Sequence, residues 1–300
     1  MADNGAMKPR TRSASPTPRR GDPPVTDPVA AWREQLEAWA IPEAILAAAP
    51  ESPWGFPVGL FRTRAEQASG EPPTPSNQEA ARWLPAGGRV LDVGAGGGAA
   101  SLPLARTAGC VVAVDESAGM LEAFRAAAAA AGVAAETVQG RWPEAAGRVG
   151  QADVVVCHHV LYNVPDLAPF VAALTGHARR RVVAELTGRH PLVELAPLWR
   201  QFHGLDRPDG PTAGDAEAAL RALGLDVVRQ DWTGAPRTGF DRWEDLVAFT
   251  RRRLCLPAER EPEVAAALAP FRSDDGHGVR ADRGPRLVTT FSWPGSAPTA

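Results

Sequence analysis

The sequence predicts an α/β protein built around a parallel sheet that is covered by helices on both faces. Two observations predict this class. Between residues 89 and 187, short apolar runs alternate with stretches that fit helices, and these runs lack the polar alternation of a sheet with one wet face. The chain also has 300 residues and 44% hydrophobic content, enough to bury a substantial core.

The strands and helices follow from the same pattern. Strands are expected at Val90–Val93, Val111–Val114, weakly around Val138, and at Asp153–Cys157, Arg181–Leu186, Leu225–Val228 and Leu287–Trp293. Helices are expected at Leu102–Thr107, Gly119–Ala131, Val164–Leu174, Leu192–Phe202, Ala216–Leu223, Asp241–Leu254 and Pro262–Leu268. Asp215 fits the N-cap of the helix that Gly224 closes.

Composition divides the chain into three parts. Residues 1–28 are rich in Pro, Arg, Ser and Asp, and such a tail is expected to be disordered. Residues 29–80 begin with Trp32, Leu36 and Trp39 on one helical face, and they are expected to form a helical cap. Residues 81–300 are expected to form the core, with helices and loops of the substrate side at 188–285.

Charge and cysteine usage limit the classes of function. A net charge of −3 gives no general attraction to nucleic acid or acidic lipid, and no apolar run is long enough to cross a bilayer. Cys110, Cys157 and Cys255 are scattered, so we expect reduced thiols in a cytoplasmic protein, and no metal site. Arginine dominates over lysine beside abundant Ala, Gly and Pro, a bias associated with GC-rich bacterial genomes.

A glycine-rich loop carries the strongest functional signal. The strand Val90–Val93 runs into Gly94-Ala95-Gly96-Gly97-Gly98. Glycines allow a tight turn and let a ligand approach the main chain without Cβ atoms in the way. The helix expected next would direct free N–H groups at that ligand. This arrangement suits a nucleotide-like ligand at the carboxyl end of the first strand.

The loop alone fits two kinds of ligand. Gly94, Gly96 and Ala99 satisfy the relaxed dinucleotide fingerprint G-x-G-x-x-G/A. Asp115 ends the second strand and suits the hydroxyls of a ribose, which either ligand contains. Asp92, two residues before the first glycine, stands where dinucleotide enzymes usually have an apolar or small residue. It therefore favours a nucleotide-like ligand other than a dinucleotide.

Four segments together resemble the class I methyltransferase superfamily. V-L-D-V-G-A-G-G-G is similar to its first motif and V-V-A-V-D-E-S to its second. A-D-V-V-V-C-H-H-V-L-Y-N-V-P-D resembles the segment around its fourth strand, and R-V-V-A-E-L its fifth strand. The resemblance covers about residues 80–190. It implies a doubly wound, mostly parallel seven-stranded sheet whose last strand, Leu287–Trp293, is antiparallel, and S-adenosylmethionine as cofactor.

The resemblance also implies which residues hold the cofactor. The glycine loop would flank the methionine and ribose, with Asp92 supporting the loop or reaching the amino group through water, and Asp115 would take the ribose hydroxyls. Where superfamily members often carry an acidic contact to adenine, this sequence has Arg141 and Trp142, and Trp142 would stack on the ring or simply pack. The implied cofactor-binding set is Asp92, Gly94, Gly96, Gly98, Asp115, Glu116, Met120, Arg141, Trp142 and Cys157.

The candidates for catalysis are histidines near the strand ends. Transfer from a sulfonium needs a positioned nucleophile first, and a base only when the acceptor keeps its proton until late. His158 and His159 follow the fourth strand, and we expect them to face opposite ways; His190 follows the fifth, and His203 follows a later helix. A histidine titrating near neutrality suits a proton acceptor. A ring bonded to the backbone or packed in the core stays open for each.

The expected function is methyl transfer from S-adenosylmethionine to a small molecule, with O-, N- and C-methylation unresolved. Aromatic residues before the core, Trp54, Phe56 and Phe61, together with Arg62, are candidates for an apolar acceptor pocket. One alternative is an S-adenosylmethionine-binding protein without transferase activity. Another is an NAD(P)-dependent oxidoreductase, which lacks support because Tyr162 and Lys8 are the sole tyrosine and lysine.

Overall fold

The computed structural model describes residues 27–54, 72–234, 239–274, 278–281 and 286–296. The predicted tail lies outside these ranges except for its last two residues. The last of these, Pro28, is already the first residue of helix α1. Within the described ranges, no helix combines the length and apolar character needed to cross a membrane.

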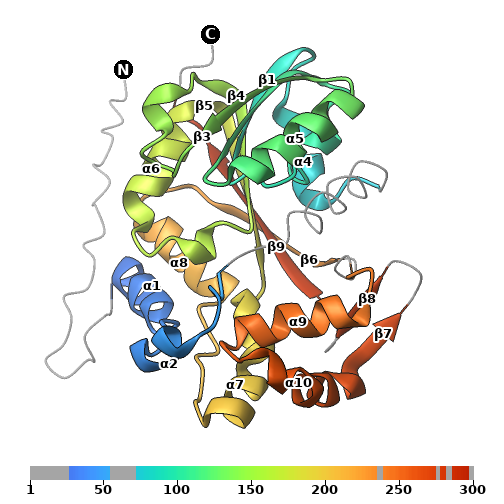
Figure 1. Ribbon diagram of the computed structural model, residues 1–300. Helices are drawn as coiled ribbons and strands as arrows, with labels where there is room; N and C mark the ends of the chain where they lie inside the picture. Colours follow the sequence, from blue (N-terminus) through green and yellow to red (C-terminus); the bar gives the residue numbers. More distant parts are fainter. Residues whose placement is uncertain (1–26, 55–71, 235–238, 275–277, 282–285, 297–300) are drawn as a thin grey trace, which may run out of the picture.

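A seven-stranded sheet forms the centre of the fold (Figure 1), as predicted. Its order is β3-β2-β1-β4-β5-β9-β6, with β9 antiparallel to both neighbours and the other strand pairs parallel. The strands are β1 (Gly88–Val93), β2 (Ala108–Asp115), β3 (Ala134–Gln139), β4 (Ala152–His158), β5 (Ala178–Thr187), β6 (Val228–Gly234) and β9 (Arg286–Pro294). A separate two-stranded sheet pairs β7 (Arg272–Asp274) with β8 (Val279–Ala281).

Helices cover both faces of the sheet, which explains why its central strands are apolar on both sides. One face packs on α1 (Pro28–Glu37), α6 (Leu167–His177) and α8 (Ala213–Ala222). The opposite face packs on α4 (Pro75–Trp83) and α5 (Ala118–Ala130). The carboxyl ends of the parallel strands therefore meet at one edge between two helical layers, where ligands of open α/β sheets bind.

A third apolar cluster lies apart from the sheet. It joins α7 (Ala196–His203), α9 (Trp243–Arg253) and α10 (Glu261–Leu268), and α2 (Glu43–Ala48) packs against it through Ile45. Figure 1 shows α2, α7, α9 and α10 at the end of the molecule far from α5. The helices of residues 29–80 thus join three different clusters, and the predicted boundary between residues 80 and 81 falls inside α4.

Two local predictions are wrong. The sixth strand was expected at Leu225–Val228, but β6 occupies Val228–Gly234, because it is an edge strand whose exposed polar residues carry no apolar signal. Asp215 is not the N-cap of α8. Thr212 is the N-cap, and Asp215, the third residue of the helix, closes a capping box in which it accepts a hydrogen bond from the backbone N–H of Thr212 at 2.7 Å.

Candidate functional site

The loop after β1 turns on three glycines with left-handed backbone angles. The φ angles of Gly94, Gly96 and Gly98 are 72°, 53° and 96°, a region that residues with a Cβ rarely adopt. A Cβ on Gly94 would stand 2.4 Å from Cγ2 of Val160, and one on Gly98 would stand 2.7 Å from Cδ1 of Leu102. The loop therefore presents a backbone surface that larger residues would not form.

The α-helix expected after this loop is wrong. The structure has a 3-10 turn, η1 (Leu102–Leu104), and β2 begins four residues later at Ala108. Such a short turn aligns too few peptide dipoles to produce a helix macrodipole. The N–H groups available at this site are consequently those of the loop itself.

Asp115 joins the end of β2 to the glycine loop. Its Oδ2 accepts a hydrogen bond from the backbone N–H of Gly96 at 2.9 Å, and its Oδ1 accepts one from the N–H of Ser117 at 2.9 Å. A carboxylate offers about four lone-pair positions, so each oxygen can still accept a further donor. The residue expected to receive ribose hydroxyls thus stands beside the loop with capacity left to do so.

Asp92 is completely buried on β1, next to this loop. Its Oδ2 accepts a hydrogen bond from Oγ of Ser101 at 2.6 Å, while Oδ1 has no hydrogen-bond partner among the described residues. Burial raises the pKa of Asp92 to about 7; the hydrogen bond from Ser101 opposes this rise, and the charge of Asp115 adds to it. An unpartnered buried oxygen is costly, so it marks a place where a ligand donor would be stabilised.

Three of the predicted adenine-side residues surround the carboxyl ends of β2 and β3. Met120 is buried in the first turn of α5. Glu116 follows Asp115, and its Oε1 lies 3.7 Å from Nε of Arg141, which follows β3. Both of these charged side chains are largely exposed. The structure therefore brings Glu116 and Arg141 together at the rim of the candidate site.

Trp142 is a core residue, which favours packing over stacking on adenine, the two roles that the sequence left open. Its side chain is only 5% exposed, and its Nε1 donates a hydrogen bond to the carbonyl oxygen of Phe170 at 3.2 Å. The ring also meets His177 edge to face, with centroids 5.1 Å apart. A base stacks on an open ring face, and this packing leaves none.

Cys157 lies on β4 in the apolar cluster that packs on α6. It is fully buried, and burial raises the pKa of its thiol far above the usual range, so the group is neutral and inert. The thiol therefore lies in the core. If Cys157 borders the cofactor as predicted, the contact is made by its backbone.

His158, the last residue of β4, and His159, which follows it, both approach the carboxylate of Glu185 on β5. Nδ1 of His158 lies 3.8 Å from Oε2 of Glu185, and Nε2 of His159 lies 2.9 Å from Oε1. The expectation that the two rings face opposite ways is wrong. His159 has a φ of 60°, and this left-handed conformation removes it from the strand alternation on which the expectation depended.

Arg286, at the start of β9, completes what we call the histidine–glutamate cluster: His158, His159, Glu185 and Arg286. Its Nη2 lies 2.6 Å from Nε2 of His159. A guanidinium only donates and a carboxylate only accepts, so Nε2 can serve one of these neighbours at a time. Its protonation therefore decides whether His159 bonds Arg286 or Glu185.

Burial sets the charges within this cluster. It lowers the pKa of His158 and lowers the pKa of His159 to about 4, although Glu185 favours both protonated rings. Burial alone would raise the pKa of Glu185, but its contacts with the two histidines outweigh this and hold the pKa below its usual range. At neutral pH the rings are uncharged and Glu185 is ionised. Nε2 of His158 is buried without a hydrogen-bond partner in the described part of the chain.

Sequence reasoning missed Glu185 and Arg286 as site residues. Glu185 had a usable signal, because it is the single acidic residue of β5 and interrupts the apolar run that begins at Val182, and a buried carboxylate needs partners. Arg286 had none, since about one hundred residues separate it from Glu185 in the sequence. Only the antiparallel insertion of β9 beside β5 brings them together.

The other two candidate histidines hold the structure together. His190 stacks on Trp39 with ring centroids 4.3 Å apart, and its Nδ1 accepts a hydrogen bond from the N–H of Leu192. Burial lowers the pKa of His190 to about 4. His203 bonds the carbonyl oxygen of Leu254 through Nε2 at 2.7 Å. These contacts favour a packing role for both histidines, the alternative that the sequence left open for each.

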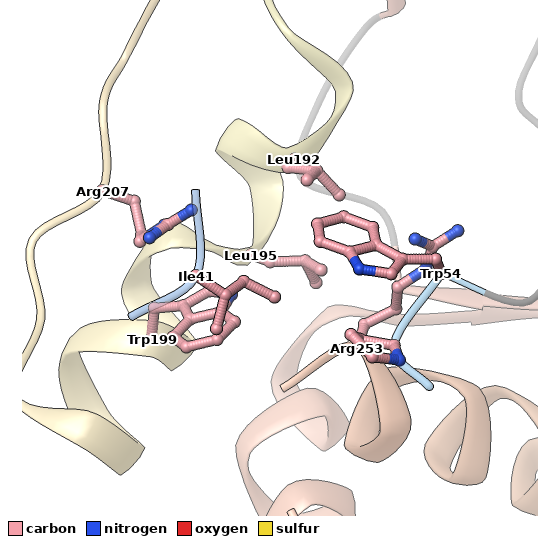
Figure 2. Close-up of a pocket in the computed structure, with 8 residues that line it drawn as sticks. Ile41, Trp54, Leu192, Leu195, Trp199, Arg207 and Arg253 are labelled. Carbon is pink, nitrogen blue, oxygen red and sulfur yellow. The ribbon is translucent and has the colours of Figure 1, made fainter. Parts of the chain in front are cut away.

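A pocket lies outside the sheet (Figure 2). It is formed by residues that precede and follow α2 in the sequence, by the segment after β5, and by α9. We call it the arginine pocket; its lining residues are Ile41, Pro53, Trp54, Leu192, Leu195, Trp199, Arg207 and Arg253. Trp54 was one of four candidates for an acceptor pocket. The other three, Phe56, Phe61 and Arg62, lie outside the described residues.

Comparison with known proteins shows what the chain is similar to. Residues 90–180 match the family model described as a methyltransferase domain. A ubiquinone biosynthesis O-methyltransferase from Xanthomonas axonopodis pv. citri (strain 306) is 38% identical over 94 residues, 31% of this chain and 39% of the relative. A protein of the same name from Azorhizobium caulinodans is 29% identical over 179 residues, 60% of this chain and 57% of the relative. The matches thus span about two fifths to three fifths of these relatives.

Among solved structures, a cyclopropane-fatty-acyl-phospholipid synthase-like protein from Lactobacillus casei ATCC 334 aligns with a TM-score of 0.50 at 14% identity. The alignment covers 87% of this chain and 99% of that protein, and it supports the fold. Residues 90–180 thus match a methyltransferase domain, and the order of the seven-stranded sheet agrees with a Rossmann-like methyltransferase fold.

Proposed function

We propose that this protein transfers a methyl group from S-adenosylmethionine to a small-molecule acceptor. The observation that carries the proposal is the glycine loop of β1 held against Asp115 at the end of β2. It combines an open backbone surface with a carboxylate that can accept two further hydrogen bonds. The names of the relatives, which are O-methyltransferases, support an oxygen acceptor.

The residues present fit this cofactor. A Cβ at Gly94 would clash with Val160, and the φ of 72° also excludes most side chains there, so the loop keeps a bare backbone beside Asp115. We assign the ribose hydroxyls to Asp115 and the adenine side to Met120, with Glu116 and Arg141 at its rim. The unpartnered Oδ1 of Asp92 would accept a donor from the methionine end, directly or through water.

When bound, S-adenosylmethionine supplies an electrophilic methyl group on a sulfonium whose departure gives a neutral thioether. The acceptor contributes the electron pair of the new bond, and its proton leaves during or after the transfer. The protein therefore needs to hold the acceptor in line and keep water away. It needs a strong base only for an acceptor that stays protonated until late.

We propose that His158 and His159 orient the acceptor. Their lowered pKa values make them weak bases, so neither is suited to remove a tightly held proton at neutral pH. A neutral imidazole still accepts a hydrogen bond from a hydroxyl through its unprotonated nitrogen. Glu185 would decide which ring nitrogen is unprotonated by accepting a hydrogen bond from the other one, as a carboxylate does for the histidine of other catalytic groups.

We also propose that the reaction takes place in the cytoplasm and involves neither nucleic acid nor a membrane. Cys110, Cys157 and Cys255 are free thiols, as expected for a reducing compartment. The formal charge of −3 supports a small acceptor over a polyanion.

Calorimetric titration of the full chain with S-adenosylhomocysteine and, separately, with NADH tests the proposal. We expect the homocysteine product to bind and NADH not to bind. Binding of NADH alone would overturn methyl transfer and favour the dinucleotide alternative. Release of S-adenosylhomocysteine in the presence of acceptor candidates then separates a transferase from a protein that only binds the cofactor.

A further inference from the structure

The geometry points to Ser76 and Thr290 as positioning residues that act through Glu185 on the histidines proposed to orient the methyl acceptor. We call the side chains of Trp232, Thr290 and Ser76 the hydroxyl relay, because they form a line of hydrogen-bonding groups that leads to that carboxylate. The inference rests on the proposed methyl transfer, since the relay affects that reaction through the two histidines.

The relay lies in a polar interface between α4 and the sheet. Oγ of Ser76, in the first turn of α4, lies 2.6 Å from Oγ1 of Thr290 on β9. Nε1 of Trp232, on the edge strand β6, donates a hydrogen bond to the same Oγ1 at 3.0 Å. Ser76 and Thr290 are buried, with 0% and 3% exposure. Their hydroxyls therefore depend on partners within the protein.

The chemistry of these three groups sets the direction of their hydrogen bonds. An indole N–H only donates, whereas a hydroxyl donates one hydrogen bond and can accept others. Because Thr290 accepts from Trp232, its own proton is available to Oγ of Ser76. The proton of Ser76 is then available to a further hydrogen-bond acceptor, so the relay presents a donor at its Ser76 end.

The carboxylate of Glu185 is the acceptor at that end. Glu185 stands directly opposite Thr290 in the antiparallel pairing of β5 with β9, so both side chains lie on the same face of the sheet. Burial acts to raise the pKa of Glu185, and its contacts with the histidines and with Ser76 hold that pKa below its usual range. Donation from a neutral hydroxyl thus helps to keep the carboxylate ionised without a proton taken from a histidine.

The ionised carboxylate in turn favours one protonation form of the neutral His158 ring. Nδ1 of His158 lies 3.8 Å from Oε2 of Glu185, and the negative charge favours the form whose proton is on Nδ1. Nε2 is then unprotonated, and it is buried without a hydrogen-bond partner in the described part of the chain. This nitrogen would accept a hydrogen bond from a hydroxyl of the methyl acceptor.

The segment that carries His158 lies next to the glycine loop. A Cβ on Gly94 would stand 2.4 Å from Cγ2 of Val160, two residues after His158. Helix α4 is tied to the same region, because Nδ2 of Asn77 in its first turn donates a hydrogen bond to the carbonyl oxygen of Ala100 at 3.1 Å. The turn of α4 that carries the relay is therefore fixed against the chain that follows the loop proposed to bind the cofactor.

Imidazole titration tests the relay. Proton NMR of the full chain gives the pKa values of His158 and His159, with His158→Gln and His159→Asn to assign the signals. The double variant Ser76→Ala/Thr290→Val removes both hydroxyls and retains every member of the histidine–glutamate cluster, whose charges act on these rings. We expect both pKa values to rise, because a carboxylate that has lost its neutral donor gains more from a protonated ring.

Two variants serve as matched controls. Thr290→Ser keeps both hydroxyls of the relay and is expected to titrate like the parent. Thr289→Val removes the hydroxyl of the adjacent residue of β9, which donates a hydrogen bond to Asp231 at 2.7 Å and is outside the relay, and it should also titrate like the parent. Thermal unfolding shows whether each variant is folded. Ser76→Ala alone gives the same test if the double variant is unstable.

Imidazole pKa values that stay the same or fall when the hydroxyls are removed would overturn the inference, as would an equal rise in Thr289→Val. Calorimetric titration of the parent with S-adenosylhomocysteine separates this result from the proposed function. If the imidazole pKa values rise while S-adenosylhomocysteine does not bind, methyl transfer fails and with it the role of the relay in that reaction. If S-adenosylhomocysteine binds and the pKa values do not rise, only the relay fails.

Discussion

The ring of His159 reaches the carboxylate of Glu185, at 2.9 Å, from a backbone position with a φ of 60°. Such a conformation costs about 1–2 kcal/mol in a residue other than glycine, and strain of this kind persists where the surroundings hold it. The interaction lies at the carboxyl edge of the sheet, next to the loop proposed to bind the cofactor.

Replacing Glu185 is expected to change the titration of its neighbour. The carboxylate favours protonated His159, so Glu185→Gln should lower the pKa of His159 below its value of about 4. Proton NMR of the imidazole signals against pH measures this, with His159→Asn to assign the resonance, since Asn tolerates a left-handed backbone. Glu136→Gln on the exposed edge of β3 is the control. A pKa that is the same in the Glu185→Gln protein would show that the pair does not interact.

Asp115→Ala is expected to weaken binding of S-adenosylhomocysteine by about 1–3 kcal/mol, the usual cost of leaving buried polar groups unpaired. The variant also releases the N–H groups of Gly96 and Ser117. Isothermal calorimetry measures the change. Asp153→Ala, which removes a carboxylate that accepts from the N–H of Arg89 at the opposite edge of the sheet, should bind like the parent. Unchanged affinity in Asp115→Ala would mean that the ribose binds elsewhere.

Gly94→Ala is expected to destabilise the protein more than Gly132→Ala. Both glycines have positive φ, 72° and 69°, so each alanine costs about 1–2 kcal/mol of backbone strain. A Cβ at Gly132 meets nothing within 4 Å, whereas one at Gly94 stands 2.4 Å from Val160, which adds about 1–3 kcal/mol of overpacking. Urea unfolding compares them. Adding Val160→Ala should restore part of the loss, and equal destabilisation of the two single variants would refute the clash.

The effect of Asp92→Asn on the free energy of unfolding is expected to depend on pH. Burial raises the pKa of Asp92 in the folded protein to about 7. The stability that this raised pKa contributes is fully present below the unfolded pKa of about 4, and it is lost as pH rises through 7. Asparagine stays neutral, so the variant should gain about 2–3 kcal/mol relative to the parent between pH 5 and pH 8. Chemical unfolding at both pH values measures the difference. A stability difference that is nearly the same at pH 5 and pH 8 would place the pKa of Asp92 below 5.

Much of the fold could be predicted because its signals are local. Each apolar strand between Val90 and Leu186 is a short run, the glycine loop directly follows the first of them, and Asp92 and Asp115 lie in or at the end of the first two. Edge strand β6 was misplaced because an exposed strand has no apolar run. The helix expected at Leu102–Thr107 failed because the chain there had to enter β2 at Ala108.

The sequence by itself determined most of the sheet and the glycine loop, and it carried the resemblance to methyltransferases, since these depend on residue types within short segments. Only the tertiary structure decided which side chains meet. It buried Trp142 against Phe170, made His190 a stacking partner of Trp39, and brought Glu185 and Arg286 to His159. The physical reason is that burial and charge pairing depend on strands and helices that are distant in sequence. They become neighbours only when the sheet forms, with β9 between β5 and β6.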